Sequence, residues 1–198
     1  MLTCVRHGES AENLVLHQSD NPEAIHLHRA NPPLTDTGRM QAVHTAKQLV
    51  KLVQPEQRLL VWTSKLDRAI STAAPLIEEL EKAGIAFEYQ ERLDLNEKKE
   101  SVVGVKDNEP LFEFISRVKK FFQQIDIDDS THLIIVGHSV FISVLTSLME
   151  NPLHQFDDLV YFNPNCAITR FVKQQLVMQG SIDHLPIDLR TGVNYIRN

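Results

Sequence analysis

Short apolar runs alternate with longer amphipathic segments along this chain of 198 residues. Short runs rich in Val, Ile and Leu indicate buried strands, whereas apolar residues spaced three or four positions apart indicate helices. Strands are predicted at 2–5, 59–62, 85–89, 133–136 and 166–172, and helices at 39–53, between Ser64 and Gly84, at 111–125 and at 141–149. Because strands and helices alternate, the sequence predicts an α/β fold, a three-layer α/β/α sandwich around a largely parallel sheet.

The length of the chain fits a single domain covering residues 1–198. The run 133–136 is apolar throughout and is expected in the centre of the sheet, where helices cover both faces. Ser64 and Asp67 have the spacing of a capping box at the start of a helix. The segments 14–33 and 96–110 are polar and lack apolar periodicity, so they are the predicted loops or lids.

Composition narrows the classes of partner. The formal net charge of −6 disfavours general binding to nucleic acid or to an anionic membrane. No apolar run approaches the roughly 18 residues of a membrane span, and the first run turns polar at Arg6, too early for a signal peptide. Cys4 and Cys166 each lie in an apolar run and are predicted to be buried, reduced thiols. We therefore expect a soluble cytoplasmic protein with no nucleic-acid and no membrane partner, whose oligomeric state the sequence leaves open.

Reactive side chains follow the ends of predicted strands. Arg6 and His7 follow the first strand, His138 follows the central one, and Arg68 begins the helix after strand 59–62. Parallel sheets bind ligands beyond the carboxyl ends of their strands. Guanidinium forks suit phosphate, and the helix that starts near Ser139 would add backbone N–H donors. These residues predict a phosphate pocket.

The same pocket would make His7 a nucleophile. Nearby guanidinium charges lower the pKa of an imidazole and so favour its neutral form. A phosphohistidine intermediate would split transfer into two easier steps, with the positive pocket stabilising the phosphoryl oxygens in both.

In their order, these residues resemble the signature of the histidine phosphatase superfamily, the phosphoglycerate-mutase-like proteins. Six segments carry the resemblance, from residue 6 to residue 185. They are Arg6-His7-Gly8-Glu9-Ser10-x-x-Asn13, Pro33-Leu34-Thr35-x-x-Gly38-x-x-Gln41-Ala42, Ser64-x-Leu66-x-Arg68-Ala69-x-x-Thr72-Ala73, Val136-Gly137-His138-Ser139, Asn165-Cys166-Ala167-Ile168 and Asp183-His184-Leu185.

The resemblance implies a phosphoglycerate mutase-like fold and a histidine acid-type phosphatase that needs no metal and no cofactor. His7 would accept the phosphoryl group, and Arg6, Arg68 and His138 would bind the phosphate. Asn13 would help to hold it, and His184 would be structural or peripheral. The implied substrate is a small phosphate monoester, with phosphoprotein as a further candidate.

A general acid must protonate the leaving oxygen. The family takes it from an acidic residue after the third strand, often in a Leu-x-Glu context, and Leu95-Asn96-Glu97 fits that pattern. Glu91, Asp94 and Glu100 are competitors. The family's usual glycine- and tryptophan-containing stretch after the acid is missing, and residues 98–104 read Lys-Lys-Glu-Ser-Val-Val-Gly instead. The mutases of the family are usually longer than this chain, which favours hydrolysis over mutase-type transfer.

Three other readings compete with a phosphatase. Gly137-His138-Ser139-Val140-Phe141 resembles the nucleophile elbow of α/β-hydrolases, with Asp157 and His184 following in the right order, although Phe141 replaces the final glycine. A catalytically silent module that binds phospholigands would use the same pocket. The pair His26 and His28 could form a metal site, but the spacing offers no further ligand.

Overall fold

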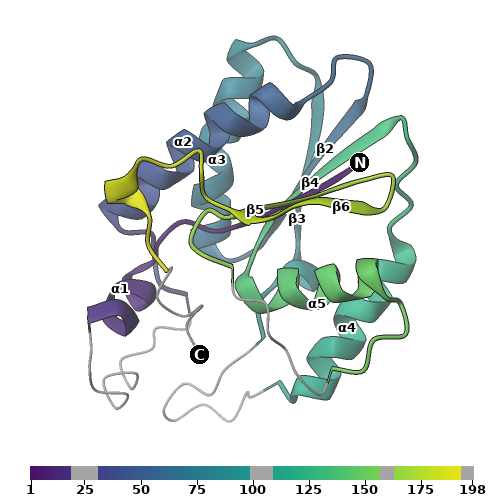
Figure 1. Ribbon diagram of the computed structural model, residues 1–198. Helices are drawn as coiled ribbons and strands as arrows, with labels where there is room; N and C mark the ends of the chain where they lie inside the picture. Colours follow the sequence, from purple (N-terminus) through teal and green to yellow (C-terminus); the bar gives the residue numbers. More distant parts are fainter. Residues whose placement is uncertain (19–30, 99–108, 157–162, 193–198) are drawn as a thin grey trace.

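A computed structural model describes residues 1–18, 31–98, 109–156 and 163–192. Within these residues a six-stranded sheet has the order β3-β2-β4-β1-β5-β6 (Figure 1). The strands are β1 (Leu2–Arg6), β2 (Arg58–Ser64), β3 (Phe87–Arg92), β4 (Thr131–Gly137), β5 (Ile168–Val172) and β6 (Gln175–Ser181). The helices are α1 (Ala11–Gln18), α2 (Asp36–Leu52), α3 (Asp67–Lys82), α4 (Leu111–Gln124) and α5 (Ser139–Glu150), with 3-10 turns η2 (Leu93–Leu95) and η3 (Ile187–Leu189).

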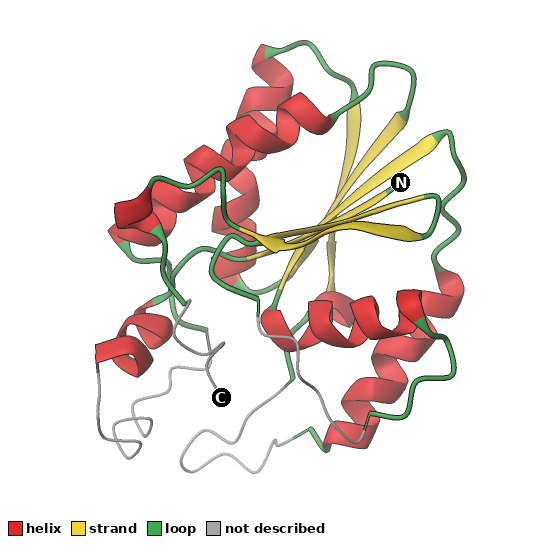
Figure 2. Ribbon diagram, in the orientation of Figure 1, coloured by secondary structure: helices red, strands yellow, loops and turns green. Residues whose placement is uncertain are grey.

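The sheet is mostly parallel. Strands β1 to β4 are parallel to one another, whereas β5 pairs antiparallel with β1 and β6 pairs antiparallel with β5 at that edge. Helices α2 and α3 cover one face of the sheet, and α4 and α5 cover the other (Figures 1 and 2). The predicted α/β/α sandwich is confirmed.

Strand β4 shows why a central strand is apolar on both faces. Leu133 and Ile135 pack into the core cluster that includes α4 and α5, whereas Ile134 and Val136 pack into the cluster on the side of α2 and α3. All four side chains are buried. Because successive side chains of a strand point to opposite faces, an uninterrupted apolar run is what a doubly covered strand requires. The predicted central position is confirmed, since β4 lies between β2 and β1.

The predicted capping box is wrong. Ser64 is the last residue of β2, and helix α3 begins after Leu66, whose side chain provides no cap. The Ser64 hydroxyl accepts the backbone N–H of Leu66 at 3.1 Å, but it also bonds to His138 and Asn96. The Ser64 hydroxyl is therefore shared between the start of the helix and two side chains from other segments of the chain.

Two elements escaped the sequence prediction. Helix α1 occupies 11–18, so the start of the predicted loop 14–33 is wrong. This helix has no apolar stripe; its sign is a polar cap, in which Ser10 Oγ accepts the N–H of Asn13 at 3.3 Å.

Strand β6 follows β5 through Lys173 and Gln174, whose φ angles of 48° and 63° match a two-residue hairpin turn. That turn usually carries Asn-Gly, so its sequence signal was absent here. Residues 19–30 and 99–108 of the two predicted loops lie outside the described residues.

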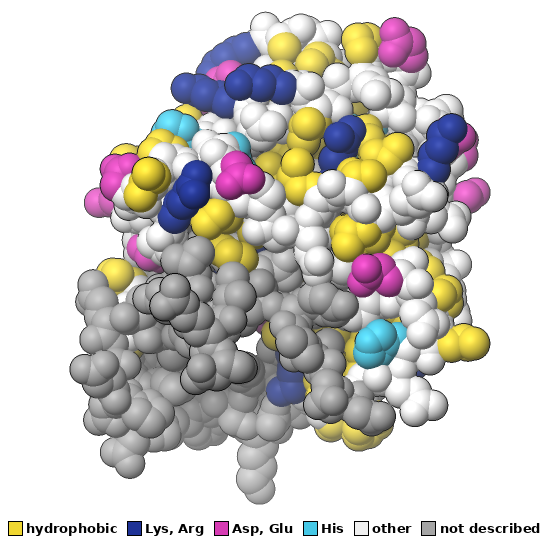
Figure 3. Space-filling view, in the orientation of Figure 1, with side chains coloured by type: hydrophobic (Ala, Val, Ile, Leu, Met, Phe, Trp, Pro, Cys, Tyr) yellow, Lys and Arg dark blue, Asp and Glu magenta, His cyan; other side chains and the backbone are white. Residues whose placement is uncertain are grey.

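In the part of the chain that the structure describes, no helix combines the length and apolar character needed to cross a bilayer. On the face in Figure 3, exposed hydrophobic side chains lie scattered among polar and charged ones, an ordinary arrangement for a protein surface.

The end of β1 and the start of α2 are in backbone contact. A Cβ atom added to Gly38 would overlap the carbonyl oxygen of Glu9, and one added to Gly8 would overlap the carbonyl oxygen of Gly38. Thr35 caps α2 by accepting the N–H of Gly38 at 3.0 Å and donates to the Glu9 carboxylate at 2.8 Å. Helix α2 therefore fixes the backbone immediately after His7.

This contact makes a stability prediction. Gly38→Ala should lower the free energy of unfolding by about 1–3 kcal/mol, the usual cost of overpacking, even though alanine normally favours a helix. Gly137→Ala is the control, because its methyl group would lie 3.8 Å from Ile135 Cγ2 and 3.9 Å from Leu95 O, ordinary contact distances. Urea unfolding of both variants tests this; a Gly38→Ala protein as stable as the parent would contradict it.

Candidate active site

The carboxyl ends of the parallel strands bring the predicted residues together. Arg6 pairs with Gly137, so His7 and His138 follow neighbouring strands at the same edge of the sheet. Both imidazoles are buried, with 4% and 0% of their surface exposed. Their ring centroids lie 5.2 Å apart in an edge arrangement. The two histidines therefore form one site.

The tautomer of His7 follows from its hydrogen bonds. Nδ1 lies 2.7 Å from the carbonyl oxygen of Gly8, which can only accept, so Nδ1 carries the proton and donates. Nε2 is therefore unprotonated in the neutral ring, and it accepts a hydrogen bond from Nε of Arg68 at 3.2 Å. The lone pair needed for attack lies on Nε2, beside a guanidinium.

Burial is the largest cause that lowers the pKa of His7 well below its ordinary value. The positive charges of Arg68 and Arg6 lower this pKa further, and the hydrogen bond to Gly8 opposes them. Burial, followed by the charge of Arg68, also lowers the pKa of His138. Both rings are consequently neutral near neutral pH.

The two arginines of the site are buried, and hydrogen bonds hold the segments around them. They expose only 5% (Arg6) and 7% (Arg68) of their surface. Arg6 Nη1 donates to the carbonyl oxygen of Asn163 at 2.6 Å. Thr72 Oγ1 donates to the carbonyl oxygen of Arg68 at 2.6 Å and accepts the N–H of Gly8 at 2.9 Å. The first turn of α3 is thereby tied to the turn after His7.

A chain of side chains orients His138. Its Nε2 lies 2.8 Å from Ser64 Oγ, and Ser64 Oγ lies 2.8 Å from Asn96 Oδ1. Asn96 Oδ1 also accepts the N–H of Lys65 at 3.0 Å, which identifies it as the amide oxygen. Ser64 therefore donates its one proton to Asn96 and accepts from Nε2–H of His138. Nδ1 of His138, which has no hydrogen-bond partner within the described residues, is the atom left for a phosphate.

Glu97 lies beside the start of α5. Its Oε2 accepts the N–H of Val140 at 3.1 Å, and Oε1 accepts the N–H of Lys98 at 3.1 Å. His138 is the N-cap residue of the same helix. Burial raises the pKa of Glu97, and the two backbone hydrogen bonds and then the charges of Arg68 and Arg6 oppose that increase. The carboxyl group is therefore close enough to both arginines to feel their charges.

The competing acids have other surroundings. Glu91 is exposed and accepts a long hydrogen bond of 3.5 Å from Tyr89. Asp94 is paired with Arg92 at 2.6 Å. Glu100 lies outside the described residues. Glu97 is the described candidate that the structure brings to the arginines and histidines.

Asn13 and Ser139 are buried in the same region, and their side-chain oxygens hold loops. Asn13 Oδ1 accepts from Nδ2 of Asn165 at 2.9 Å, so its amide nitrogen is the group able to donate to a phosphate. Ser139 Oγ accepts the N–H of Asn163 at 3.2 Å, while its proton can still be donated. Each of the two side chains therefore has a structural partner, and their part in binding phosphate stays a prediction.

The sequence analysis missed the supporting amides. Asn165 Nδ2 donates to the carbonyl oxygen of His7 at 3.3 Å, and Gln41 Oε1 accepts the N–H of Glu9 at 2.7 Å. Gln41 Nε2 also donates to the carbonyl oxygen of Leu189 at 2.7 Å, which ties the late chain to the His7 turn. Asn165 and Gln41 belong to the segments that resemble the family. Their residue types alone, however, do not predict which backbone groups they bind.

The hydrolase alternative is wrong. A catalytic triad needs the serine hydroxyl bonded to the histidine. His184 Nε2 instead bonds to Thr45 Oγ1 at 2.9 Å, and Ser139 Oγ bonds to Asn163. Asp157 lies outside the described residues.

The proposed histidine pair for a metal, His26 and His28, also lies outside the described residues. Within residues 1–18, 31–98, 109–156 and 163–192, no group of three or more His, Cys, Asp or Glu side chains is placed to hold a metal ion.

Several solved structures share this fold. A putative alpha-ribazole-5'-P phosphatase from Escherichia coli K-12 aligns with a TM-score of 0.68 at 18% identity, covering 91% of this chain and 96% of its own. An open reading frame product of Mycobacterium tuberculosis aligns with a TM-score of 0.63 at 20% identity, covering 90% and 96%. A mycobacterial glucosyl-3-phosphoglycerate phosphatase in complex with VO3 aligns with a TM-score of 0.62 at 17% identity, covering 91% and 98%.

No curated protein sequence matches the chain significantly. The family model of the histidine phosphatase superfamily (branch 1) matches residues 2–97 and 77–176, which include both histidines, both arginines and Glu97. With the fold and the paired histidines, this match means that the chain belongs to the histidine phosphatase superfamily, branch 1.

Proposed function

We propose that this protein is a metal-independent phosphatase that hydrolyses phosphomonoesters through a phosphohistidine intermediate on His7. The observation that carries the proposal is the state of His7: its Nδ1–H is donated to Gly8, and its unprotonated Nε2 lies 3.2 Å from Nε of Arg68. A neutral nucleophile beside a buried cation suits attack on an anionic phosphate.

In the first step, His7 Nε2 forms a bond to phosphorus as the bond from phosphorus to the ester oxygen breaks. Arg6 and Arg68 stabilise the negative charge on the phosphoryl oxygens. His138, neutral before the phosphate dianion binds, takes up one proton with it, donates from Nδ1, and releases that proton with the product. Glu97 supplies the proton that the departing alkoxide needs. A raised pKa keeps part of Glu97 protonated where an ordinary glutamate would be ionised.

In the second step, water attacks the phosphohistidine. The Glu97 carboxylate takes a proton from that water, the bond from phosphorus to Nε2 breaks, and phosphate leaves. His7 returns to its neutral form and Glu97 to its protonated form, so the cycle is closed without a cofactor.

The proposed substrate is a small phosphate monoester, with phosphoprotein as a second class. The neighbours in fold include an alpha-ribazole-5'-P phosphatase and a glucosyl-3-phosphoglycerate phosphatase, whose names describe small phosphorylated metabolites. Mutase-type transfer would use the same phosphohistidine but would return the phosphoryl group to an organic acceptor. We place the activity in the cytoplasm.

Phosphate release from p-nitrophenyl phosphate in the presence of a chelator is the first test. The parent protein should turn over, and His7→Ala should lose all measurable turnover because no other described side chain replaces Nε2. His44→Ala removes a half-buried histidine of α2 and serves as the control. A parent that loses activity in chelator, or an active His7→Ala protein, would contradict the proposal.

Glu97→Gln should reduce kcat/KM most for poor leaving groups. An alkoxide needs a proton in the transition state, whereas p-nitrophenolate leaves without much help, and general acid catalysis contributes about 10²–10⁴-fold. Rates for a series of phenyl phosphates with different leaving-group pKa values measure the effect. Equal losses across that series would remove Glu97 from the role of acid.

The pH dependence of kcat/KM follows from the two shifted groups. His7 must be neutral, and its lowered pKa places the rising limb below 6.5. Glu97 must be protonated, and its raised pKa places the falling limb above 4.5. We expect a maximum on the acid side of neutrality, after correction for ionisation of the substrate, and we expect Glu97→Gln to lack the falling limb. A rising limb above pH 7 in the parent would contradict this assignment.

A further inference from the structure

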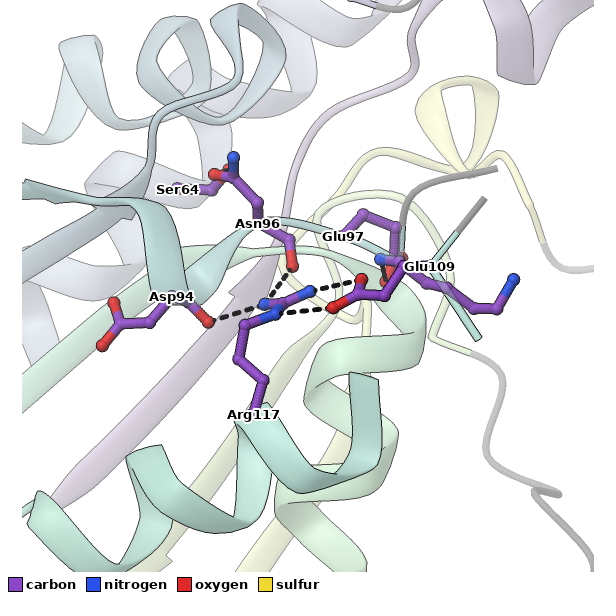
Figure 4. Close-up of polar contacts among 7 residues, drawn as sticks. Ser64, Asp94, Asn96, Glu97, Glu109 and Arg117 are labelled. Atoms are coloured by element: carbon purple, nitrogen blue, oxygen red, sulfur yellow. Dashed lines mark hydrogen bonds and ion pairs between the residues drawn. The ribbon is translucent and has the colours of Figure 1, made fainter. Parts of the chain in front are cut away.

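One arginine of α4 holds the backbone that leads to Glu97. Arg117 Nη1 donates to the carbonyl oxygen of Asp94 at 2.8 Å and to that of Asn96 at 2.9 Å (Figure 4). On its other edge, Nε and Nη2 form a two-pronged pair with the Glu109 carboxylate at 3.0 and 2.8 Å. A single guanidinium thus joins three points of the chain.

The segment that it holds is short, and Leu95 anchors it in the core. Leu95, the last residue of η2, is fully buried and packs in the same core cluster as Phe114 of α4. The carbonyl oxygens of Asp94 and Asn96, on either side of Leu95, both accept hydrogen bonds from Arg117. Leu95 thus anchors the turn in the core, and Arg117 binds the backbone on both sides of that anchor.

Asn96 is the residue at which this turn meets the two groups that handle protons. Its side-chain oxygen accepts from Ser64, which in turn accepts from His138, and its chain neighbour is Glu97. Glu97 then bonds back to Val140 in the first turn after His138. The backbone carbonyl of Asn96 is therefore the point from which the placement of both His138 and Glu97 can be controlled, and Arg117 binds that carbonyl.

We propose that Arg117 is a positioning residue for proton transfer, which holds the Asp94–Asn96 turn so that Glu97 reaches the leaving oxygen. This inference rests on the proposed function, because it assumes that Glu97 is the general acid. Arg117 touches neither substrate nor reacting atoms; it acts through the backbone.

Arginine suits this task better than lysine. Its planar fork presents five N–H donors, so one edge can bind a carboxylate while the far nitrogen binds two carbonyl oxygens. The Glu109 carboxylate orients the fork and balances its charge, and the side chains of the pair are only 24% and 14% exposed. A lysine ammonium group at this position could bind either the carboxylate or the carbonyl oxygens, but not both.

Loss of Arg117 should act on chemistry through geometry. Displacing a catalytic group by about 1 Å can cost about 10²-fold in rate. Because the displaced group is the acid, the loss should appear with poor leaving groups and be small with good ones. A general loss of stability would instead reduce both rates together.

The experiment compares kcat/KM for phenyl phosphate and p-nitrophenyl phosphate. Arg117→Met should lower the phenyl to p-nitrophenyl ratio by about tenfold or more, in the direction of Glu97→Gln. Arg117→Lys should lower it as well, and Glu109→Gln should lower it less, because the two carbonyl contacts remain. Thermal unfolding is measured for each variant, and Arg117→Lys decides the question where Arg117→Met fails to fold.

Arg92→Met is the matched control. Arg92 is 25% exposed and paired with the side chain of Asp94, so it resembles Arg117 in burial and in having an acidic partner. Its two hydrogen bonds to Asp94 reach the carboxylate and not the backbone of the turn. The rate ratio of Arg92→Met should equal that of the parent, and an equal drop in this control would overturn the assignment to Arg117.

The double variant Arg117→Met with Glu97→Gln separates the outcomes. Its rate ratio should match that of Glu97→Gln alone, since a missing acid cannot be misplaced; a further drop would overturn the inference. A normal ratio in folded Arg117→Met or Arg117→Lys, beside a reduced ratio in Glu97→Gln, would overturn the inference and leave the proposed function standing. A parent inactive on both substrates would contradict the proposed function itself, and the inference with it.

Discussion

The hydrogen bond between Nδ1 of His7 and the carbonyl oxygen of Gly8 fixes which imidazole nitrogen is able to react. Everything around that bond holds the turn in place. Gly8 and Gly38 lie in backbone contact that a side chain would prevent, and the N–H of Gly8 is bound by Thr72. The carbonyl of His7 receives Asn165. If the turn relaxed, the ring could rotate or change tautomer, and Nε2 would lose its place beside Arg68.

Burial and positive charge then set opposite protonation states within one site. Desolvation penalises the charged form of every group, so it lowers the pKa of His7 and raises that of Glu97. The arginine charges add to the shift of His7 and oppose the shift of Glu97. A neutral His7 and a protonated Glu97 can therefore coexist in mildly acidic solution, which is the combination that the proposed first transfer step requires.

The sequence predicted the order of most elements and the reactive side chains, because both leave local signals. Apolar runs marked the strands. The segments that resemble the family, taken in their order, placed Arg6, His7 and His138 at strand ends and Arg68 at the start of a helix, and the topology brings these places together. What could not be predicted depends on contacts between distant residues. Ser64 was predicted to cap a helix but bonds to His138 across the sheet, and no local signal pointed to Arg117, which binds a turn more than twenty positions earlier. Helix α1 has no apolar stripe, and strand β6 does not follow an Asn-Gly turn, so the usual sequence signal of each element is missing.

The most direct measurement of the central claim is to trap the covalent intermediate. The protein would be mixed with a substrate that has a good leaving group, quenched rapidly in alkali and analysed by peptide mass spectrometry. Phosphohistidine survives alkali and is lost in acid, so the account predicts an acid-labile phosphoryl group on the peptide that contains His7, absent from the His7→Ala protein. Steady turnover with no such adduct, or with the adduct on another residue, would contradict the account.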